Sequence, residues 1–560
     1  MEKYSELLRE LLNKRGITSE AEAELFLNPD YEKGLYDPFL MRDMERACVR
    51  IYEAVESNQK IMIYADYDCD GIPGAVIMQD FFKLINFQNF EVYIPQRNSE
   101  GYGLNMEALK QFSESGVNLL ITIDLGITAV DEVAQAIVYG MDVIITDHHL
   151  PRQSLGDGGL TSLILPRAYG ILNPKVDDYP EKMLCGSGVV FKLVQGLIKK
   201  YGEYYKIKEG AEKWLLDMAG LATLSDMVPL LGENRALAYF GLKVFRKSPR
   251  PGLQKLLKKM NIDQRTISED DIAFMVTPKI NVASRMDDPR RAYELLSTKD
   301  EVEGGELANH LSKINEDRKY IVSGIMKDVH KTFEKRELRE VIVVGNPSWK
   351  VGVLGLVAGK IMDEHERPVF VWGKDENDMI KGSCRSPGSV SVVELMTEVS
   401  DSFLEFGGHE MAGGFTVHTE KVHFLEDVLS VAFQKVKRVE GDKKINFDIK
   451  IDLASVNMKV WNELERLAPY GCENPKPVFM FPGVKIEKIK KFGKNGSGEH
   501  LEIIFSSPNS RSVKAISFFS GIESFTRDIS EGGSVDLIAT FDLSRFGGKV
   551  ELRLRIVDII

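Results

Sequence analysis

The sequence predicts an α/β protein built around a doubly wound parallel sheet. Two alternating patterns, apolar runs and helical stretches, predict this fold class, and the chain length predicts several domains. Between residues 51 and 240, apolar β-branched runs such as 61–65 and 119–123 alternate with helical stretches such as 75–84 and 130–139. This alternation is typical of βαβ units, whose strands pair in parallel. A length of 560 residues is too great for a single hydrophobic core, so we expect three or four domains.

The other segments are assigned in chain order. Residues 1–50 have an amphipathic helical pattern and are expected to pack on the next part of the chain, the first α/β domain at 51–295. Apolar residues then recur at three- and four-residue steps amid dense charge, which predicts one long connecting helix, assigned to 296–338. A second α/β domain is expected at 339–440. Short alternating strands separated by glycine and serine predict a β-barrel or sandwich at 441–560.

The composition is that of a globular protein in a reducing compartment. With 43% hydrophobic and 28% charged residues, every domain can bury its own core. The five cysteines include no CxxC pair, which favours free thiols over disulfides. The chain starts with charged residues where a signal peptide would have its apolar core, and no long uncharged apolar stretch comes after them. We therefore expect a cytoplasmic protein with no membrane segment.

The net charge of −12 excludes general electrostatic binding of nucleic acid, so an anionic partner must be held locally. Two basic stretches could do this. Residues 241–260 carry seven basic side chains and no acid, and residues 485–494 carry five lysines against Glu487. For either stretch alone, a solvated surface is the simpler interpretation.

Acidic and imidazole side chains directly follow four apolar segments. Carboxyl ends of parallel strands meet at one edge of a sheet, so these side chains are expected to converge at four strand ends. Carboxylates and imidazoles without a thiolate pair suit Mn²⁺ or Mg²⁺, and clustered carboxylates repel one another unless a cation lies between them. The pattern therefore predicts a two-metal phosphoester-cleaving centre. Its residues are Asp66, Asp68 and Asp70 after 61–65, Asp124 after 119–123, Asp147, His148 and His149 after 143–146, and Asp226 after 214–224.

Each of these groups also has a simpler explanation when it is taken alone. The three aspartates at 66–70 could lie in a solvated turn, and Asp124 and Asp226 could each cap a helix. A lone histidine is more often structural than ligating, although an Asp-His-His cluster favours metal binding. The metal hypothesis depends on all four segments reinforcing one another.

Two later motifs are suited to phosphate. The glycine-rich segment 407–415, with His409, offers backbone N–H groups but could be only a tight turn. Ser383 and Arg385 place a hydroxyl beside a guanidinium that can bind phosphate in a bidentate manner. Residues 355–360 end in Gly-Lys without the spacing of a P-loop, so ATP binding is not supported.

In chain order, the motifs resemble those of the DHH phosphoesterase superfamily. They read Asp-Tyr-Asp-Cys-Asp-Gly at 66–71, Ile-Asp-Leu-Gly at 123–126, Asp-His-His at 147–149 and Ser-Asp-Met-Val-Pro at 225–229, and Gly-Gly-His at 407–409 is similar to the signature of the companion DHHA1 domain. Within the superfamily, residues 100–104, 278–288 and 471–479 resemble the RecJ family of single-strand-specific 5′→3′ DNA exonucleases. The resemblance covers nearly the whole chain and implies a DHH domain, a DHHA1 domain and a C-terminal OB-fold.

The resemblance also implies roles for the matching residues. The metal ligands would be Asp68, Asp70, Asp124, His148 and Asp226, with Asp124 between the two ions and Asp66 ligating or supporting the first. His149 would contact the scissile phosphate. Residues assigned to DNA or to the 5′-terminal phosphate are Arg97, Asn281, Arg285, Ser383, Arg385 and His409. In the OB-fold, the expected DNA contacts are Lys488, Lys490, Lys491, Phe492 and Lys494.

Some positions depart from the family pattern. Cys69 replaces the usual alanine, Leu125 the usual asparagine, and residues 282–284 read Val-Ala-Ser instead of Ala-Ala-Gly. Tyr64 stands where many relatives have histidine, which bears on how the first metal is held. The changes at 69, 125 and 282–284 remove no predicted ligand, but Leu125 cannot make the supporting hydrogen bond that an asparagine would offer there.

The sequence thus predicts an enzyme of DNA repair and recombination that degrades single-stranded DNA from its 5′ end to 5′-mononucleotides. Two Mn²⁺ or Mg²⁺ ions would lower the pKa of a bound water, and hydroxide would attack the phosphate in line. A groove between the lobes would admit one strand but not a duplex, and the OB-fold would add lysines and aromatic platforms. The resemblance further implies a monomer whose partners are single-stranded DNA, a helicase and a single-strand-binding protein.

Two classes of alternative stay open. Another DHH hydrolase, such as an oligoribonuclease, a cyclic-dinucleotide phosphodiesterase or a manganese pyrophosphatase, would leave the C-terminal β-domain unexplained. A non-catalytic DNA-binding scaffold is the second alternative, and the presence of every predicted ligand argues against it.

Overall fold

The computed structural model describes the chain apart from residues 98, 156–160, 437–445, 494–499, 507–510, 520 and 546–548. The chain forms two compact units. The first combines Met1–Asp37, Met227–Gly241 and Lys444–Ile560, and the second combines Pro38–Asp226 and Leu242–Lys443. Within the part of the chain that the structure describes, no helix is long and apolar enough to span a membrane.

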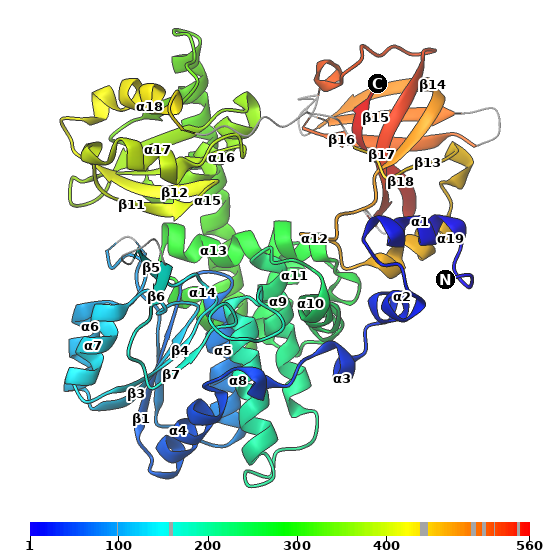
Figure 1. Cartoon of the computed structure of the whole chain (residues 1–560). Helices are drawn as coiled ribbons and strands as arrows, with labels where there is room; N and C mark the ends of the chain where they lie inside the picture. Colours follow the sequence, from blue (N-terminus) through cyan, green and yellow to red (C-terminus); the bar gives the residue numbers. More distant parts are fainter. Residues whose placement is uncertain are drawn as a thin grey trace. The chain divides into compact units, whose positions relative to one another are not determined.

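A parallel five-stranded sheet with the order β2-β1-β3-β4-β7 forms the first α/β domain (Figure 1). The chain runs from β1 out to β2 and returns to β3 on the other side of β1, so the topological switch point lies between β1 and β3. Ligands of such sheets bind there, beyond the carboxyl ends of the strands. The predicted doubly wound sheet is confirmed. Its strands are β1 Lys60–Ala65, β2 Phe90–Tyr93, β3 Val117–Ile123, β4 Asp142–Thr146 and β7 Gly170–Leu172, and its main helices are α4 Met44–Glu56, α5 Gly71–Leu84, α6 Met106–Glu114, α7 Val130–Val138 and α8 Gly186–Tyr201.

A helical section continues the domain and ends in the predicted long helix, α15, which runs Glu301–Phe333. Helices α11, α13 and α14 pack against α15. The other elements of this section are α9 Leu216–Ser225, α11 Pro251–Lys259, α12 Glu269–Asp271, the π-helix η4 Ile272–Val276, α13 Thr277–Met286 and α14 Arg290–Ser297. Helix α10 Gly232–Phe245 begins in the barrel unit, to which its residues up to Gly241 belong.

One predicted strand end is wrong, because the fourth apolar segment is helix α9. Every residue from Leu216 to Leu224 is buried. A helix that is buried all round shows no amphipathic face, so periodicity cannot distinguish it from a buried strand. Asp226 therefore follows a helix and not a strand.

The second α/β domain has a sheet of order β11-β12-β10-β9-β8, in which only the β8–β9 pairing is parallel. Alternate residues face opposite sides. Val343 and Phe370 pack with α17 and α18, whereas Ile342 and Val369 pack with α16 and α15. The elements are β8 Ile342–Gly345, α16 Leu354–His365, β9 Val369–Lys374, β10 Ile380–Arg385, α17 Val392–Glu398, β11 Phe403–His409, β12 Ala412–Val417 and α18 Leu425–Phe433.

The C-terminal strands close into a barrel. Strand β14 pairs with both β15 and β17, and because β17 is the last strand of the sheet, this second pairing closes the barrel. Closure leaves no long exposed edge and decides between barrel and sandwich in favour of the barrel. The strands are β13 Ile449–Lys450, β14 Phe479–Phe492, β15 His500–Ser506, β16 Val513–Phe518, β17 Ser534–Ser544 and β18 Glu551–Ile559.

The N-terminal helices α1 Glu6–Lys14 and α2 Glu20–Leu27 belong to the barrel unit, contrary to the expectation that they pack on the first α/β domain. Leu8 and Phe26 share one core with Phe479 and other barrel residues. Arg235 strengthens this packing, since its guanidinium donates to the carbonyls of Phe26 and Ala468, both at 2.9 Å. An amphipathic stripe indicates that a face is buried but not which partner buries it.

Candidate metal centre and phosphate-binding cavity

Asp66, Asp124 and Asp147 lie side by side at the carboxyl edge of the parallel sheet. Each follows its strand directly and donates its backbone N–H to the last residue of the neighbouring strand. The donor–acceptor distances are 3.1 Å from Asp66 to Ile123, 2.8 Å from Asp124 to Thr146 and 3.0 Å from Asp147 to Leu172. Strand pairing therefore brings together acids that are up to 81 residues apart in the chain.

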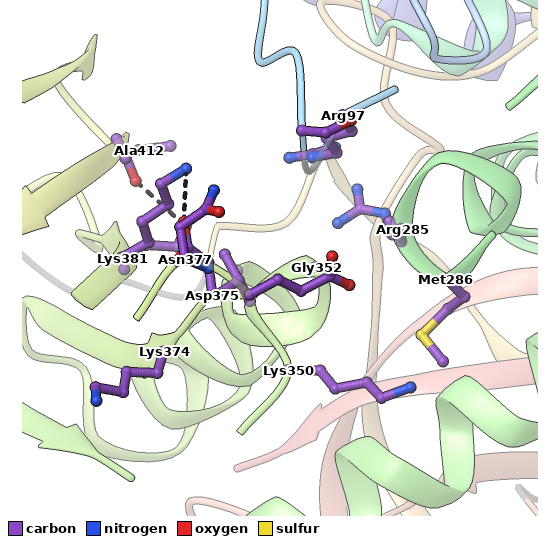
Figure 2. Close-up of a pocket in the computed structure, with 18 of the residues that line it drawn as sticks. Arg97, Arg285, Met286, Lys350, Gly352, Lys374, Asp375, Asn377, Lys381 and Ala412 are labelled. Carbon is purple, nitrogen blue, oxygen red and sulfur yellow. Dashed lines mark hydrogen bonds and ion pairs between the residues drawn. The ribbon is translucent and has the colours of Figure 1, made fainter. Parts of the chain in front are cut away.

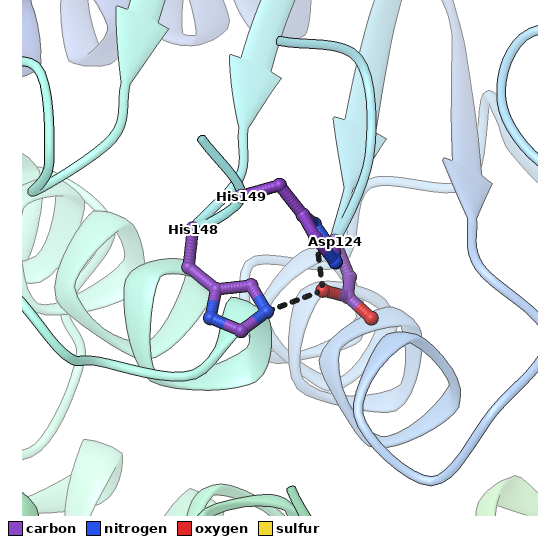
Figure 3. Close-up of side chains that lie close together, drawn as sticks. All are labelled: Asp124, His148 and His149. Carbon is purple, nitrogen blue, oxygen red and sulfur yellow. Dashed lines mark ion pairs between the residues drawn. The ribbon is translucent and has the colours of Figure 1, made fainter. Parts of the chain in front are cut away.

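Three overlapping sets of side chains come close enough to share an ion. In each set, one ligand atom per residue lies within 4.8 Å of the others. Both histidines approach the Asp124 carboxylate (Figure 3): His148 Nε2 lies 3.2 Å and His149 Nδ1 3.9 Å from its Oδ1. His148 Nε2 is also 3.8 Å from a carboxylate oxygen of Asp70 and 3.8 Å from one of Asp226. The sets are Asp66, Asp68 and Asp124; Asp124, His148 and His149; and Asp70, His148 and Asp226.

The N-terminus of α8 holds Asp70 in place. The N–H groups of Gly186 and Ser187 donate to its two carboxylate oxygens at 2.6 and 2.7 Å, and the Ser187 hydroxyl donates to its carbonyl. A Cβ on Gly186 would lie 2.6 Å from Cβ of Asp124. Only glycine lets the helix start this close to both carboxylates.

Asp147 orients His149. Its Oδ1 lies 2.8 Å from His149 Nδ1 and accepts the His149 N–H at 3.0 Å, while its Oδ2 accepts the N–H of Ile127 at 2.9 Å. Burial alone would raise the pKa of Asp147, but the bonds from His149 lower it. Burial likewise opposes protonation of His149, and the Asp147 carboxylate outweighs burial and raises the pKa of His149. With its Nδ1 engaged, His149 has Nε2 left for another group.

The other carboxylates repel one another, and the positive groups that act on them, Arg97 on Asp66 and Lys175 on Asp226, do not outweigh this repulsion. Burial, followed by neighbouring carboxylates, raises the pKa of Asp70 to about 6 and that of Asp226 to about 9. The same causes raise the pKa values of Asp66 and Asp124 well above their usual range. Among the described residues, one oxygen of Asp66 and one of Asp124 are buried without a hydrogen-bond partner.

This donor set fits a divalent cation. Burial lowers the pKa of His148 to about 3, so its imidazole is neutral and able to ligate. Hard carboxylate oxygens with one imidazole suit Mn²⁺ or Mg²⁺, and a cation would compensate the mutual repulsion of the acids.

A cavity of about 740 Å³ in the same unit gathers the predicted phosphate-binding residues (Figure 2). Arg97, Arg285, Ser383 and Arg385 all line it. Burial and then the charges of neighbouring arginines lower the pKa of Arg285 to about 10. Arg385 Nη1 donates to the Ser383 hydroxyl at 3.0 Å. Partly buried guanidinium groups that repel one another provide a ready site for a phosphate.

Other predicted residues lie elsewhere. His409 is exposed at the end of β11 and is not among the residues that line this cavity, so its role stays a prediction. Asn281 accepts the Cys69 N–H at 2.7 Å and thereby braces the loop that carries Asp68 and Asp70. The hydroxyl of Tyr64 donates to Gly103 O at 2.9 Å.

The barrel lysines also stay predictions. Lys488 and Lys491 are exposed on β14, and Lys490 pairs with Glu502 at 3.2 Å. The Phe492 ring lies 5.2 Å from that of His500. Lys494 lies outside the described residues.

Sequence reasoning missed several residues of the site. Tyr102 places its hydroxyl 3.3 Å from His149 Nδ1 and 3.3 Å from Asp124 O. Asn173 and Lys175 closely follow β7, much as the acids follow β1, β3 and β4. The polar residues after this strand were a usable signal, but β7 has three residues and was too short to be recognised.

Comparison with known proteins gives a consistent picture. Three families match successive parts of the chain: the DHH family, N-terminal domain, at residues 60–223, the DHHA1 domain at 338–438 and the RecJ OB domain at 447–558. The single-stranded-DNA-specific exonuclease RecJ of Bacillus subtilis is 33% identical over 99% of this chain and 67% of its own length. Its Escherichia coli namesake is 30% identical over 84% of this chain and 82% of its own length.

Solved structures agree with these sequence matches. RecJ of Thermus thermophilus in complex with Mn²⁺ superposes with a TM-score of 0.79 and 25% identity, covering 98% of this chain and 75% of that one. A manganese-bound exonuclease RecJ superposes with a TM-score of 0.61 and 27% identity, covering 71% of this chain and 97% of that one. The order of domains, the overall likeness in sequence and the superposition therefore all lead to one conclusion: this chain belongs to the RecJ family of DHH phosphoesterases.

Proposed function

We propose that this protein is a metal-dependent 5′→3′ exonuclease that degrades single-stranded DNA to 5′-mononucleotides. The observation that carries the proposal is the convergence of uncompensated carboxylates and His148 in the same unit as a cavity lined by arginines. The first group suits divalent cations and the second suits a terminal phosphate. The names of the RecJ relatives support the same substrate.

In this proposal, Asp68, Asp70, Asp124, His148 and Asp226 hold two Mn²⁺ or Mg²⁺ ions, and Asp66 ligates or supports the first. Bound cations of this kind activate water and neutralise phosphate charge. His149, held by Asp147, contacts the scissile phosphate.

The 5′-terminal phosphate is held by Arg97, Arg285, Arg385 and Ser383. A fixed distance between this anchor and the metal ligands makes each cut release one nucleotide from the 5′ end. Binding of the terminal phosphate would thus set both the direction and the step of the reaction.

The finer assignments rest on the family resemblance. We propose that the protein acts as a cytoplasmic monomer in DNA repair and recombination. Its partners would be a helicase and a single-strand-binding protein. The barrel would contribute DNA contacts from the exposed side chains of β14, as proteins of this kind combine basic groups with aromatic platforms.

The test is a nuclease assay on 5′-phosphorylated single-stranded DNA labelled at either end, with Mn²⁺, Mg²⁺ or EDTA. We expect labelled mononucleotides at once from the 5′ label and only at the end from the 3′ label, and no product in EDTA. Asp70→Ala and Asp226→Ala should abolish cleavage but keep strand binding. Asp131→Ala, an exposed acid on α7, is the matched control and should cleave like the parent.

The same assay decides between this function and its rivals. Faster cleavage of a dinucleotide than of a long strand would favour an oligoribonuclease-like or cyclic-dinucleotide-cleaving enzyme. Strand binding without any cleavage in either metal would favour a scaffold and refute the proposal.

A further inference from the structure

The turn Asn173-Pro174-Lys175 brings a lysine to the metal centre from a strand that sequence reasoning overlooked. Strand β7 pairs in parallel with β4, with Leu172 opposite Thr146, so its end lies beside Asp147 and the two histidines. The Asn173 side chain fixes the turn. It donates to His149 O at 2.9 Å and accepts the Lys175 N–H at 2.9 Å. Asn173 is fully buried, so this connection holds Lys175 next to His149.

Lys175 and the arginines approach different parts of the carboxylate cluster. The acids that act most on Lys175 are Asp226, Asp147 and Asp124. The arginines lie on the side of the 66–70 loop: Arg97 Cζ is 5.2 Å from the centroid of the Tyr67 ring, and Arg285 follows Asn281, which accepts the Cys69 N–H, by one turn of α13. Asp124 connects these two parts of the cluster, since it shares one ion-sized set with Asp66 and Asp68 and another with the two histidines.

The arrangement of Lys175, the metal ligands and the arginines sets the direction in which a bound DNA strand lies. The inference drawn from this arrangement rests on the proposed function. If the 5′-terminal phosphate lies among the arginines and the scissile phosphate lies over the metal ligands, the retained strand leaves past Asp226 and Lys175. We propose that the Lys175 ammonium binds the next phosphate of the retained strand, on the 3′ side of the cleaved linkage. The site would therefore recognise three successive phosphates and prefer trinucleotides and longer strands to dinucleotides.

A purely structural role explains Lys175 less well. Lys175 is only partly buried, and among the described residues no acid forms a direct ion pair with it. A positive charge beside metal ligands also weakens the binding of a cation. The Lys175 ammonium therefore weakens metal binding. Binding of an anionic group of the substrate explains why a positive charge lies at this place.

The experiment compares Lys175→Gln with the parent on three 5′-phosphorylated substrates in Mn²⁺. These are a DNA dinucleotide, a trinucleotide, and the trinucleotide with a neutral methylphosphonate at its last linkage. The dinucleotide lacks the phosphate in question, and the methylphosphonate lacks its charge. We expect the variant to lose about tenfold in kcat/KM on the trinucleotide and less than twofold on the dinucleotide. For the parent, the methylphosphonate should lower kcat/KM by the same factor as the Lys175→Gln substitution does. For the variant, the methylphosphonate should not lower kcat/KM any further.

Three controls separate a contact with DNA from a change in the metal centre. Lys175→Arg, which keeps the charge, should retain most of the trinucleotide activity. Lys83→Gln, at an exposed lysine of α5, should behave like the parent on every substrate. Binding of Mn²⁺ to Lys175→Gln, followed by thermal shift without DNA, should be as tight as in the parent or tighter.

Equal losses on all three substrates would refute the inference, because Lys175 would then act on the scissile linkage or on the metal centre. Unchanged activity on all three, or weaker Mn²⁺ binding by Lys175→Gln, would refute it as well. A parent enzyme that cleaves none of the substrates would instead overturn the proposed function, and this inference with it.

Discussion

Replacing Asp124 by asparagine should make the metal-free protein more stable, even though it removes a predicted metal ligand. Asp124 is 3% exposed, and its Oδ1 has no hydrogen-bond partner among the described residues. Asp124→Asn keeps the shape of the side chain and removes the charge. The backbone tolerates the change, because Asp124 has a φ of +62°, in the left-handed region that asparagine also adopts.

The expected gain follows from the distances. Ligand oxygens of Asp66, Asp68 and Asp124 lie within 4.8 Å of one another. At that separation two unit charges repel by about 3 kcal/mol with an effective dielectric constant of ~20. Partial protonation of the cluster relieves some of this repulsion. We therefore expect Asp124→Asn to raise the free energy of unfolding by about 1–3 kcal/mol in the absence of metal.

The same exchange at Asp147 should have the opposite sign. Asp147 is also buried, but its oxygens accept N–H groups from Ile127, His148 and His149. Asp147→Asn replaces a charged acceptor by an amide whose NH₂ faces these donors. It should lower the free energy of unfolding by about 1.5–3 kcal/mol.

Thermal and urea denaturation at neutral pH, in EDTA and in excess Mn²⁺, measure both effects. In EDTA, Asp124→Asn should unfold above the parent and Asp147→Asn below it. In Mn²⁺ the parent should overtake Asp124→Asn, because only a protein that binds the ion tightly is stabilised by mass action. If Asp124→Asn instead lost as much stability in EDTA as Asp147→Asn, the carboxylates would not repel one another in the metal-free protein, and the reasoning would be refuted.

Three other predictions concern activity and folding. Gly186→Ala, whose Cβ would meet Asp124 at 2.6 Å, should reduce nuclease activity at least about 100-fold, whereas Gly305→Ala, with open space around its Cβ, should keep full activity; equal activities would contradict the packing argument. Arg385→Ala should lower the ratio of rates on 5′-phosphate and 5′-hydroxyl strands about tenfold, and an unchanged ratio would remove it from the phosphate site. Arg235→Ala should destabilise the barrel unit by about 3 kcal/mol and speed amide hydrogen exchange in α1 and α2; unchanged exchange would show that these helices do not depend on it.

Local patterns were sufficient for much of the fold. Strands β1, β3 and β4 were recognisable because each is a short β-branched run followed at once by polar residues. Helix α15 was recognisable because apolar residues recur every three or four positions along a charged stretch. Helix α9 was missed as a helix because burial on all sides removes that periodicity. Strand β7 was missed because a strand of three residues carries too little pattern.

The acids and histidines of the candidate metal centre were foreseen for a related reason. Asp66, Asp124 and Asp147 directly follow their strands, so their convergence needs only parallel pairing in register. The residues that hold them were not foreseen. Gly186 and Ser187 reach Asp70 from the start of a helix more than 100 residues later in the chain, and no local signal connects them.

By itself, the sequence indicated the kind of chemistry, because carboxylates and imidazoles directly follow strands β1, β3 and β4 and helix α9. It also determined which domains are α/β and which is all-β, because strand and helix periods are local properties, whereas closure into a barrel was decided by strand pairing. Tertiary structure alone decided that α1 and α2 complete the core of the barrel and that Asn173 places Lys175 beside His149. The physical reason is the same in both cases. An apolar helix face or a polar side chain in the sequence indicates that another group must pack against it or hydrogen-bond to it. Many groups in the chain are compatible, and only folding brings one of them within contact distance.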